Sequence, residues 1–97
     1  MPLYVTLYKL TDQGIKNIKD SPKRLEAASK SLEAVGGKLL GAYYTLGEYD
    51  LVVISEFPSE EVGVAQALAI GSLGNVRSST MRAFTPAQFS EILKKLP

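Results

Sequence analysis

The sequence predicts an α+β domain of the split βαβ type, in which an antiparallel sheet carries its helices on one face. Three observations predict it: alternating strand formers at residues 3–10, an apolar run at residues 51–54, and helical spacing of apolar residues between the strands. The predicted order is strand, helix, strand, strand, helix, strand and a terminal helix. With 97 residues, residues 1–97 are expected to form a single domain with one modest core.

The amino-terminal part predicts a strand and an interrupted helix. Residues 3–10 alternate between two sets of strand-forming side chains, namely Leu3, Val5 and Leu7 against Tyr4, Thr6 and Tyr8. Thr11 and Asp12 can cap the helix that follows, and Ser21 before Pro22 offers a second capped start. We therefore expect a break near Asp20. Gly36 and Gly37 then end the helix by supplying a left-handed cap.

The stretch from residue 38 to residue 58 predicts a hairpin at the centre of the sheet. Residues 38–45 form its first strand, and the apolar run from Leu51 to Ile54 indicates a strand buried on both sides. Gly47 lies between the two strands, where a positive φ is expected because glycine adopts it without cost. The hairpin displays Glu48, Tyr49 and Asp50 at one end of the sheet.

The carboxyl-terminal part predicts two more helices and an edge strand. Pro58 and Ser59 begin a helix that ends at Gly71 or Gly74. Its apolar stripe is weak and consists of Ala65, Leu68 and Ala69. Residues 76–84 form a fourth strand, charged enough through Arg77 and Arg82 to suit an edge. Thr85 and Gln88 form a capping box, followed by an apolar stripe that must be buried somewhere: Phe89, Ile92, Leu93 and Leu96.

The predicted strands carry apolar or aromatic side chains on both faces. In the first strand Tyr4 and Tyr8 point opposite to Val5 and Leu7. Helices on one side of a sheet cannot cover both sets. A second copy that stacks sheet on sheet would cover the other face, so the sequence predicts a homodimer or a higher homo-oligomer.

Composition excludes several classes of function. The 11 basic and 10 acidic residues nearly cancel and are scattered, so nucleic acid is not an expected partner. Cysteine and histidine are absent, which removes thiolate chemistry and the commonest metal and haem ligand, so no metal and no cofactor are expected. No signal peptide and no bilayer-spanning run is recognised, so we expect a cytoplasmic protein without a membrane partner.

Three groups of residues are candidate binding residues, and each has a structural alternative. Glu48, Tyr49 and Asp50 can bind a cation, an amine or a hydroxyl, or Asp50 can simply accept turn amides. The tyrosines, Tyr8 and Tyr43 among them, can line a cavity with phenol donors or pack at an interface. Arg82, with Arg77, can bind a carboxylate or phosphate, or it can be a charged residue that keeps a solvated edge strand from pairing with another chain.

The run from Gly47 to Asp50 within LGEYDLVVISEFP, together with YVTLYKLTDQGIKNIKDSPKR upstream and LGNVRSSTMRAFT downstream, resembles the GYD-domain family of small prokaryotic proteins. The resemblance covers nearly the whole chain. It implies a ferredoxin-like βαββαβ domain that pairs into a dimeric α/β barrel, without a firmly assigned activity. LGEYDLVV is also similar to a hairpin in the ligand-binding domains of leucine-responsive-type regulators, which sense amino acids at subunit interfaces.

Two functional hypotheses follow, together with a purely structural assembly role as a third. The first is a homo-oligomeric module that binds a small organic ligand without chemistry, using Tyr8, Tyr43, Gly47, Glu48, Tyr49, Asp50 and Arg82. The second is a cofactor-independent monooxygenase or isomerase of the dimeric α/β barrel type. In that enzyme Glu48 or Asp50 would act as the base and tyrosines would donate hydrogen bonds.

Overall fold

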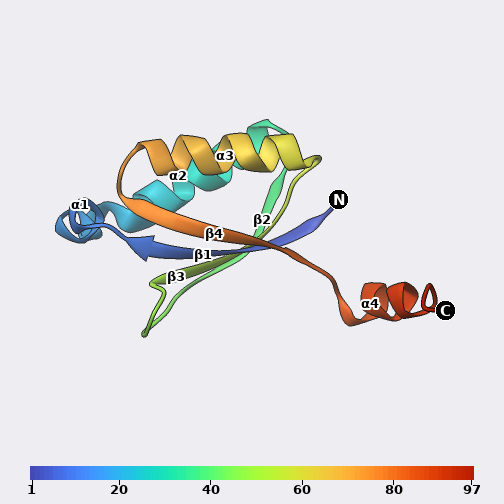
Figure 1. The fold of residues 1–97 in the computed structure, drawn as a ribbon. Coiled ribbons are helices and arrows are strands. Elements are labelled where there is room, and N and C mark those ends of the chain that lie inside the picture. The colour runs from blue at the N-terminus through green and yellow to red at the C-terminus, as the bar shows by residue number, and fades with distance from the viewer.

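The computed structural model describes residues 1–97 and shows a four-stranded antiparallel sheet with two long helices on one face (Figure 1). The strands are β1 (Leu3–Leu10), β2 (Lys38–Tyr44), β3 (Leu51–Glu56) and β4 (Val76–Ala83). Their order in the sheet is β2-β3-β1-β4, so β1 and β3 are central and β4 is an edge. This arrangement confirms the predicted α+β class and its ferredoxin-like topology.

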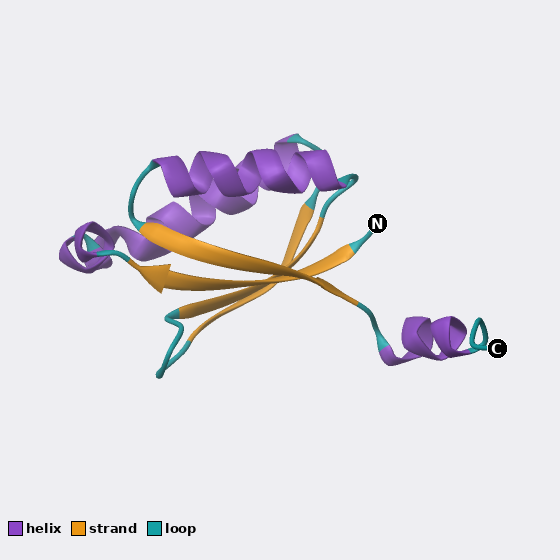
Figure 2. Ribbon diagram, viewed as in Figure 1, coloured by secondary structure: helices purple, strands orange, loops and turns teal.

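The helices follow the predicted order, and the predicted interruption is confirmed. The first helical stretch consists of α1 (Asp12–Lys16), a 3₁₀ turn η1 (Ile18–Asp20) and α2 (Ser21–Ala34). The second long helix is α3 (Glu60–Ser72), and the terminal helix is α4 (Pro86–Leu93). Figure 2 shows the helices α2 and α3 lying together above the sheet. No helix is long and apolar enough to cross a membrane.

Most of the predicted caps are present, but Ser21 does not cap a helix. Thr11 Oγ1 accepts a hydrogen bond from the Gly14 amide at 3.1 Å, and Thr85 and Gln88 form both bonds of the capping box. Ser21 is instead the first residue of α2, and its hydroxyl lies 2.9 Å from the hydroxyl of Tyr44. The prediction fails because the 3₁₀ turn leads directly into α2, so Ser21 has helical rather than extended backbone angles.

The two glycines after α2 have different roles. Gly36 has φ +86°, which is the predicted left-handed cap. Gly37 is not left-handed; there a Cβ would lie 2.5 Å from the side chain of Leu32 and 2.8 Å from the carbonyl oxygen of Glu56. Gly37 therefore allows α2 and the end of β3 to approach each other closely.

The core lies between the sheet and the two long helices, and it is small. The buried apolar side chains are those of Tyr4, Leu32, Val53 and Phe57. The rings of Tyr4 and Phe57 stack, with their centroids 4.4 Å apart. Phe57 also determines how α3 packs, because a Cβ at Gly63 would lie only 2.5 Å from its ring.

The apolar stripe predicted for α3 is only partly correct. Ala69 borders the space between α3 and the sheet, although it is exposed, whereas Ala65 and Leu68 lie on the outer side of the helix, and Leu68 is 68% exposed. The helix is apolar around most of its circumference, so periodicity does not select a face. The contact between Gly63 and Phe57 selects it instead.

The opposite face of the sheet is open in the single chain. Val5, Leu7, Val52 and Ile54 point to this side, in register with one another across β1 and β3, and are only half-buried. The prediction that β3 is buried on both sides is therefore wrong for one chain, since only its helix-facing residues Val53 and Ser55 are buried. Figures 1 and 2 show no helix against this face.

Candidate functional site

A cavity of about 340 Å³ lies between the sheet and helices α2 and α3. Of its 23 lining residues, 14 are hydrophobic. The sheet contributes Thr6, Tyr8, Val53 and Ser55 among others, and α2 and α3 contribute small residues such as Ala28 and Ala67. Residues near the exposed end of α3, such as the 63% exposed Leu73, also line the cavity, which therefore reaches the surface.

Small side chains on both layers explain why the cavity exists. Thr6 and Ser55 face the helices from the two central strands, where larger residues would fill the space. On the opposite wall Ala28, Gly63 and Ala67 present little side-chain volume. Protein interiors are normally close-packed, so small residues that face each other across a helix and sheet interface leave a hollow.

The polar groups of the cavity come from several separate elements. The hydroxyls of Thr6 and Thr80 lie 3.1 Å apart across β1 and β4. Burial raises the pKa of the Tyr8 phenol above its ordinary value of 10.0, so the phenol is a protonated hydrogen-bond donor at neutral pH. Of the two roles that the sequence leaves open for Tyr8, lining a cavity or packing at an interface, its position in this lining fits the first.

Arg24 is the one charged side chain in the lining, which contains no carboxylate. Its Nη1 donates to the carbonyl oxygen of Asn17 at 2.9 Å. Its Nη2 is buried and has no hydrogen-bond partner. A buried guanidinium nitrogen without a partner is unfavourable, so Arg24 can donate to a bound molecule. The sequence pattern gave no signal for Arg24, because it looks like an ordinary charged residue on an amphipathic helix.

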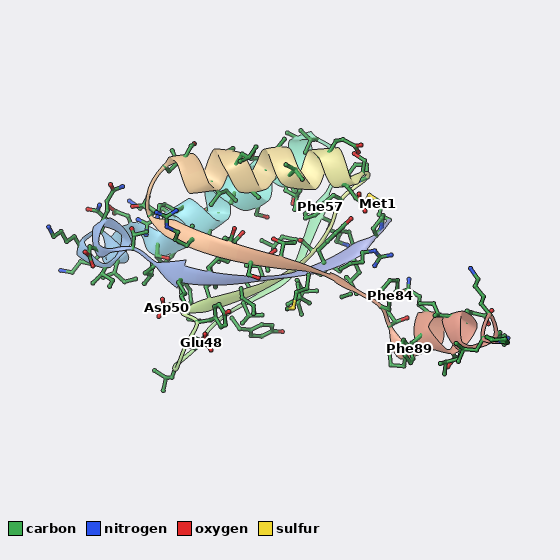
Figure 3. The ribbon with its side chains drawn as sticks, in the orientation of Figure 1. Met1, Glu48, Asp50, Phe57, Phe84 and Phe89 are labelled. Carbon is green, nitrogen blue, oxygen red and sulfur yellow. The ribbon has the colours of Figure 1, made fainter.

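The hairpin residues Gly47, Glu48, Tyr49 and Asp50 lie at a different place. Gly47 has φ +100°, as predicted, with open space around it. Lys9 connects the hairpin to β1, because its Nζ lies 3.6 Å from Glu48 Oε1 and 5.3 Å from the centre of the Tyr49 ring. Figure 3 shows Glu48 and Asp50 together at this end of the sheet, away from α2 and α3.

Asp50 fastens the hairpin to the end of β1. Its Oδ2 accepts a hydrogen bond from the Leu10 amide at 2.8 Å, and its own amide donates to the Tyr8 carbonyl oxygen at 2.8 Å. Its carbonyl oxygen accepts from the Thr45 amide at 2.9 Å, which closes the turn. Asp50 therefore holds the segment of β1 that carries Tyr8, although its carboxylate does not line the cavity.

The remaining predicted residues, Tyr43 and Arg82, are apart from both places. Tyr43 is paired with Val52 in register, points to the open face of the sheet, and is 63% exposed. The Arg82 guanidinium lies 5.7 Å from the Tyr4 ring centre and 4.4 Å from that of Phe84. It donates to the Leu3 carbonyl oxygen at 3.1 Å and to that of Ala83. The structure therefore brings four of the seven predicted residues together at the hairpin and only Tyr8 to the cavity.

The sheet order and the two helices on one face define a ferredoxin-like α+β domain, and solved structures show the same fold. TTHA0845 from Thermus thermophilus has a TM-score of 0.52 and 23% identity, covering 88% of this chain and 95% of that one. FFRP-DM1 has a TM-score of 0.56 and 23% identity, covering 87% of this chain and all of that one.

The sequence comparison then gives the family. The GYD domain model matches residues 4–93, so the chain belongs to the GYD domain family. A relative from Thermus thermophilus, described as "Glutamine synthetase and cystathionine beta-lyase binding protein", is 30% identical over 95 residues. The match spans 97% of this chain and the full length of that relative.

Proposed function

We propose that this protein is a homo-oligomeric module that holds a small organic ligand in the cavity beneath α2 and α3, without catalysing a reaction. The observation that carries the proposal is the cavity itself. Its volume of about 340 Å³ falls within the roughly 300–1,000 Å³ typical of small-molecule sites. Its lining is also mostly apolar, with polar groups that come from separate elements, as is usual for such a site.

The apolar lining supports an occupied cavity. Because the cavity reaches the surface, water enters it when no ligand is bound, and water against a mostly apolar lining is unfavourable. A ligand that displaces this water gains apolar burial and contact.

The lining indicates the chemistry of the ligand. The apolar residues favour a mostly hydrocarbon or aromatic body. The protonated phenol of Tyr8 and the unpartnered Arg24 Nη2 are both donors, so they favour a carbonyl, carboxylate or similar acceptor on the ligand. Because the lining has a cation and no carboxylate, a cationic ligand is disfavoured.

The same lining bears on the enzymatic hypothesis. Glu48 and Asp50 are absent from it, and Tyr8 is held in its protonated form. A reaction within the cavity would therefore have to proceed without a carboxylate base. A binding role fits these groups better.

The test is a thermal-shift screen of small metabolites on the parent and on two variants of α3 alanines. Ala67 lines the cavity and Ala65 lies on the exposed side of the same helix, so Ala67→Leu fills the cavity while Ala65→Leu is the matched control. At least one acceptor-bearing apolar compound should stabilise the parent and Ala65→Leu and lose its effect on Ala67→Leu. No stabilising compound, or an equal shift in Ala67→Leu, would contradict the proposal.

A second candidate is binding to another protein, and the relative's description is the observation that favours it. If this chain shares that role, it should bind purified glutamine synthetase or cystathionine beta-lyase in a biosensor assay with the enzyme immobilised. An unrelated enzyme of similar charge serves as the control. Equal signals on all three surfaces would reject the second candidate.

A further inference from the structure

The terminal helix α4 stands apart from the rest of the chain. Figure 1 shows it beyond the end of the sheet and on the side away from α2 and α3. The hydrogen bonds and the ion pair of this segment all lie within residues 85–96. Its apolar stripe remains exposed: Phe89 is 52% exposed, Ile92 38%, Leu93 47% and Leu96 66%.

A helix of this length does not persist alone. Isolated helices shorter than about 12–15 residues are marginal in water, and α4 has 8 residues. Its capping box and Pro86 define where it starts, but local capping is worth only about 1 kcal/mol. The exposed stripe must therefore be buried against another surface.

The size of the exposed surface indicates what that surface is. A compact monomer of 10.5 kDa should expose about 5,400 Å², whereas this chain exposes 6681 Å². The excess of about 1,300 Å² is more than the roughly 800 Å² that each partner contributes to a standard interface. The radius of gyration is 14.7 Å, against about 12.5 Å for a compact chain of this length.

We propose that α4 is an exchanged arm. Two copies of this chain stack their open sheet faces on each other, and the α4 of each copy packs its apolar stripe against the other copy. The proposal rests on the pairing of chains in the proposed function but not on the cavity. One chain carries two uncovered apolar surfaces, the α4 stripe and the sheet face that includes Val5, Leu7 and Ile54. A two-fold symmetric pair covers both surfaces in both copies at once.

Exchange, rather than folding back, follows from the position of the arm. The strand β4 ends at Ala83 and α4 begins at Pro86, so the connection has only two residues. Figure 3 shows Phe84 and Phe89 where the chain leaves the end of the sheet and runs away from the core. With so short a connection, a partner stacked on the open face meets the arm without any rearrangement of the chain.

The first test measures the dimer dissociation constant by light scattering and dilution. Phe89→Glu combined with Leu93→Glu should raise it roughly a hundredfold, a factor of ten for each lost anchor. Ala87→Glu, which the 3.6-residue period places on the opposite side of the same helix, is the control and should change it little. Circular dichroism must show that the sheet is retained in both variants. A monomeric parent, or a pair insensitive to the double change, would overturn the proposal.

The second test identifies the chain that receives the arm. In an isotope-filtered NMR experiment on mixed labelled and unlabelled protein, the Phe89 ring and Ile92 methyls should show contacts between chains. Contacts found only within one chain would overturn the exchange while leaving the dimer itself intact. Neither result alters the ligand response of the cavity, so a failure of the arm and a failure of the cavity are distinguished.

Discussion

Asp50 shows how a residue of the hairpin motif from Gly47 to Asp50 can affect a site that it does not line. Its carboxylate and backbone hold the hairpin to β1 through Leu10 and Tyr8, which are 40 and 42 residues away in sequence. The site and its support are thus separate parts of one hydrogen-bonded unit. Of the two roles that the sequence leaves open for Asp50, this geometry favours the structural one.

Removing the Asp50 acceptor should therefore reduce stability more than ligand response. Asp50→Ala leaves the partly buried Leu10 amide without its partner, so the free energy of unfolding should fall by about 1–3 kcal/mol. Asp50→Asn keeps an oxygen acceptor and should lose less. Urea unfolding with a thermal-shift screen measures both effects. Unchanged stability with a lost ligand response would instead show that Asp50 contacts the ligand.

Tyr8 gives a prediction about alkaline pH. Burial raises its pKa in the folded state above 10.0, so above that pH the unfolded chain loses this proton while the folded chain keeps it. Stability from this group is therefore complete below about pH 10 and falls as the pH rises from there towards the folded pKa. As the pH rises above about 10, Tyr8→Phe should therefore lose less stability than the parent. Urea titrations at each pH measure it.

The control for the Tyr8 experiment is Tyr43→Phe, because Tyr43 is 63% exposed. All other ionisable groups are common to the three proteins, so their effects cancel in the comparison. If Tyr43→Phe flattens the pH dependence as much as Tyr8→Phe does, the burial of Tyr8 is not the cause.

At the scale of the elements, substitutions in α3 test how closely this helix approaches the sheet. Its two helical glycines have opposite surroundings: a Cβ at Gly63 would lie 2.5 Å from the Phe57 ring, and a Cβ at Gly71 would meet nothing within 4 Å. Gly71→Ala should stabilise by about 0.5–1 kcal/mol through helix propensity. Gly63→Ala should destabilise despite the same propensity gain. Equal shifts in thermal melts would contradict the close contact between α3 and Phe57.

The strands, the interrupted first helix and most caps could be predicted from sequence because their signals are local. Alternation defines β1, and Thr85 with Gln88 defines the start of α4. The face of α3 could not be predicted, because the helix is apolar nearly all round and a contact with Phe57 orients it. The prediction that Ser21 caps a helix fails for a similar reason, since the preceding 3₁₀ turn leads directly into α2 and Ser21 is already helical.

The candidate site was harder to predict than the fold. Tyrosine enrichment points to Tyr8, and the structure places Tyr8 in the cavity lining. The remainder of the cavity is formed by small residues such as Thr6, Ser55 and Ala67, which look unremarkable in sequence and matter only where two layers face each other. The conspicuous motif from Gly47 to Asp50 instead marks the hairpin that supports β1.

At the scale of the whole molecule, the chain has two unfilled features: a cavity beneath its helices and an uncovered apolar face on the other side of the sheet. We propose a ligand for the first and a second copy for the second. The two proposals are physically independent, since the cavity lies on one side of the sheet and the open face on the other. Oligomerisation therefore need not cover the ligand, and exchange of the ligand need not open the dimer.

The most direct test of the cavity proposal is a crystal structure of protein purified without unfolding. We predict density for a small, mostly apolar molecule between the sheet and helices α2 and α3, with an acceptor atom within hydrogen-bond distance of the Tyr8 hydroxyl or Arg24 Nη2. Helices that close onto Thr6 and Ser55, leaving no cavity and no density, would contradict the proposal.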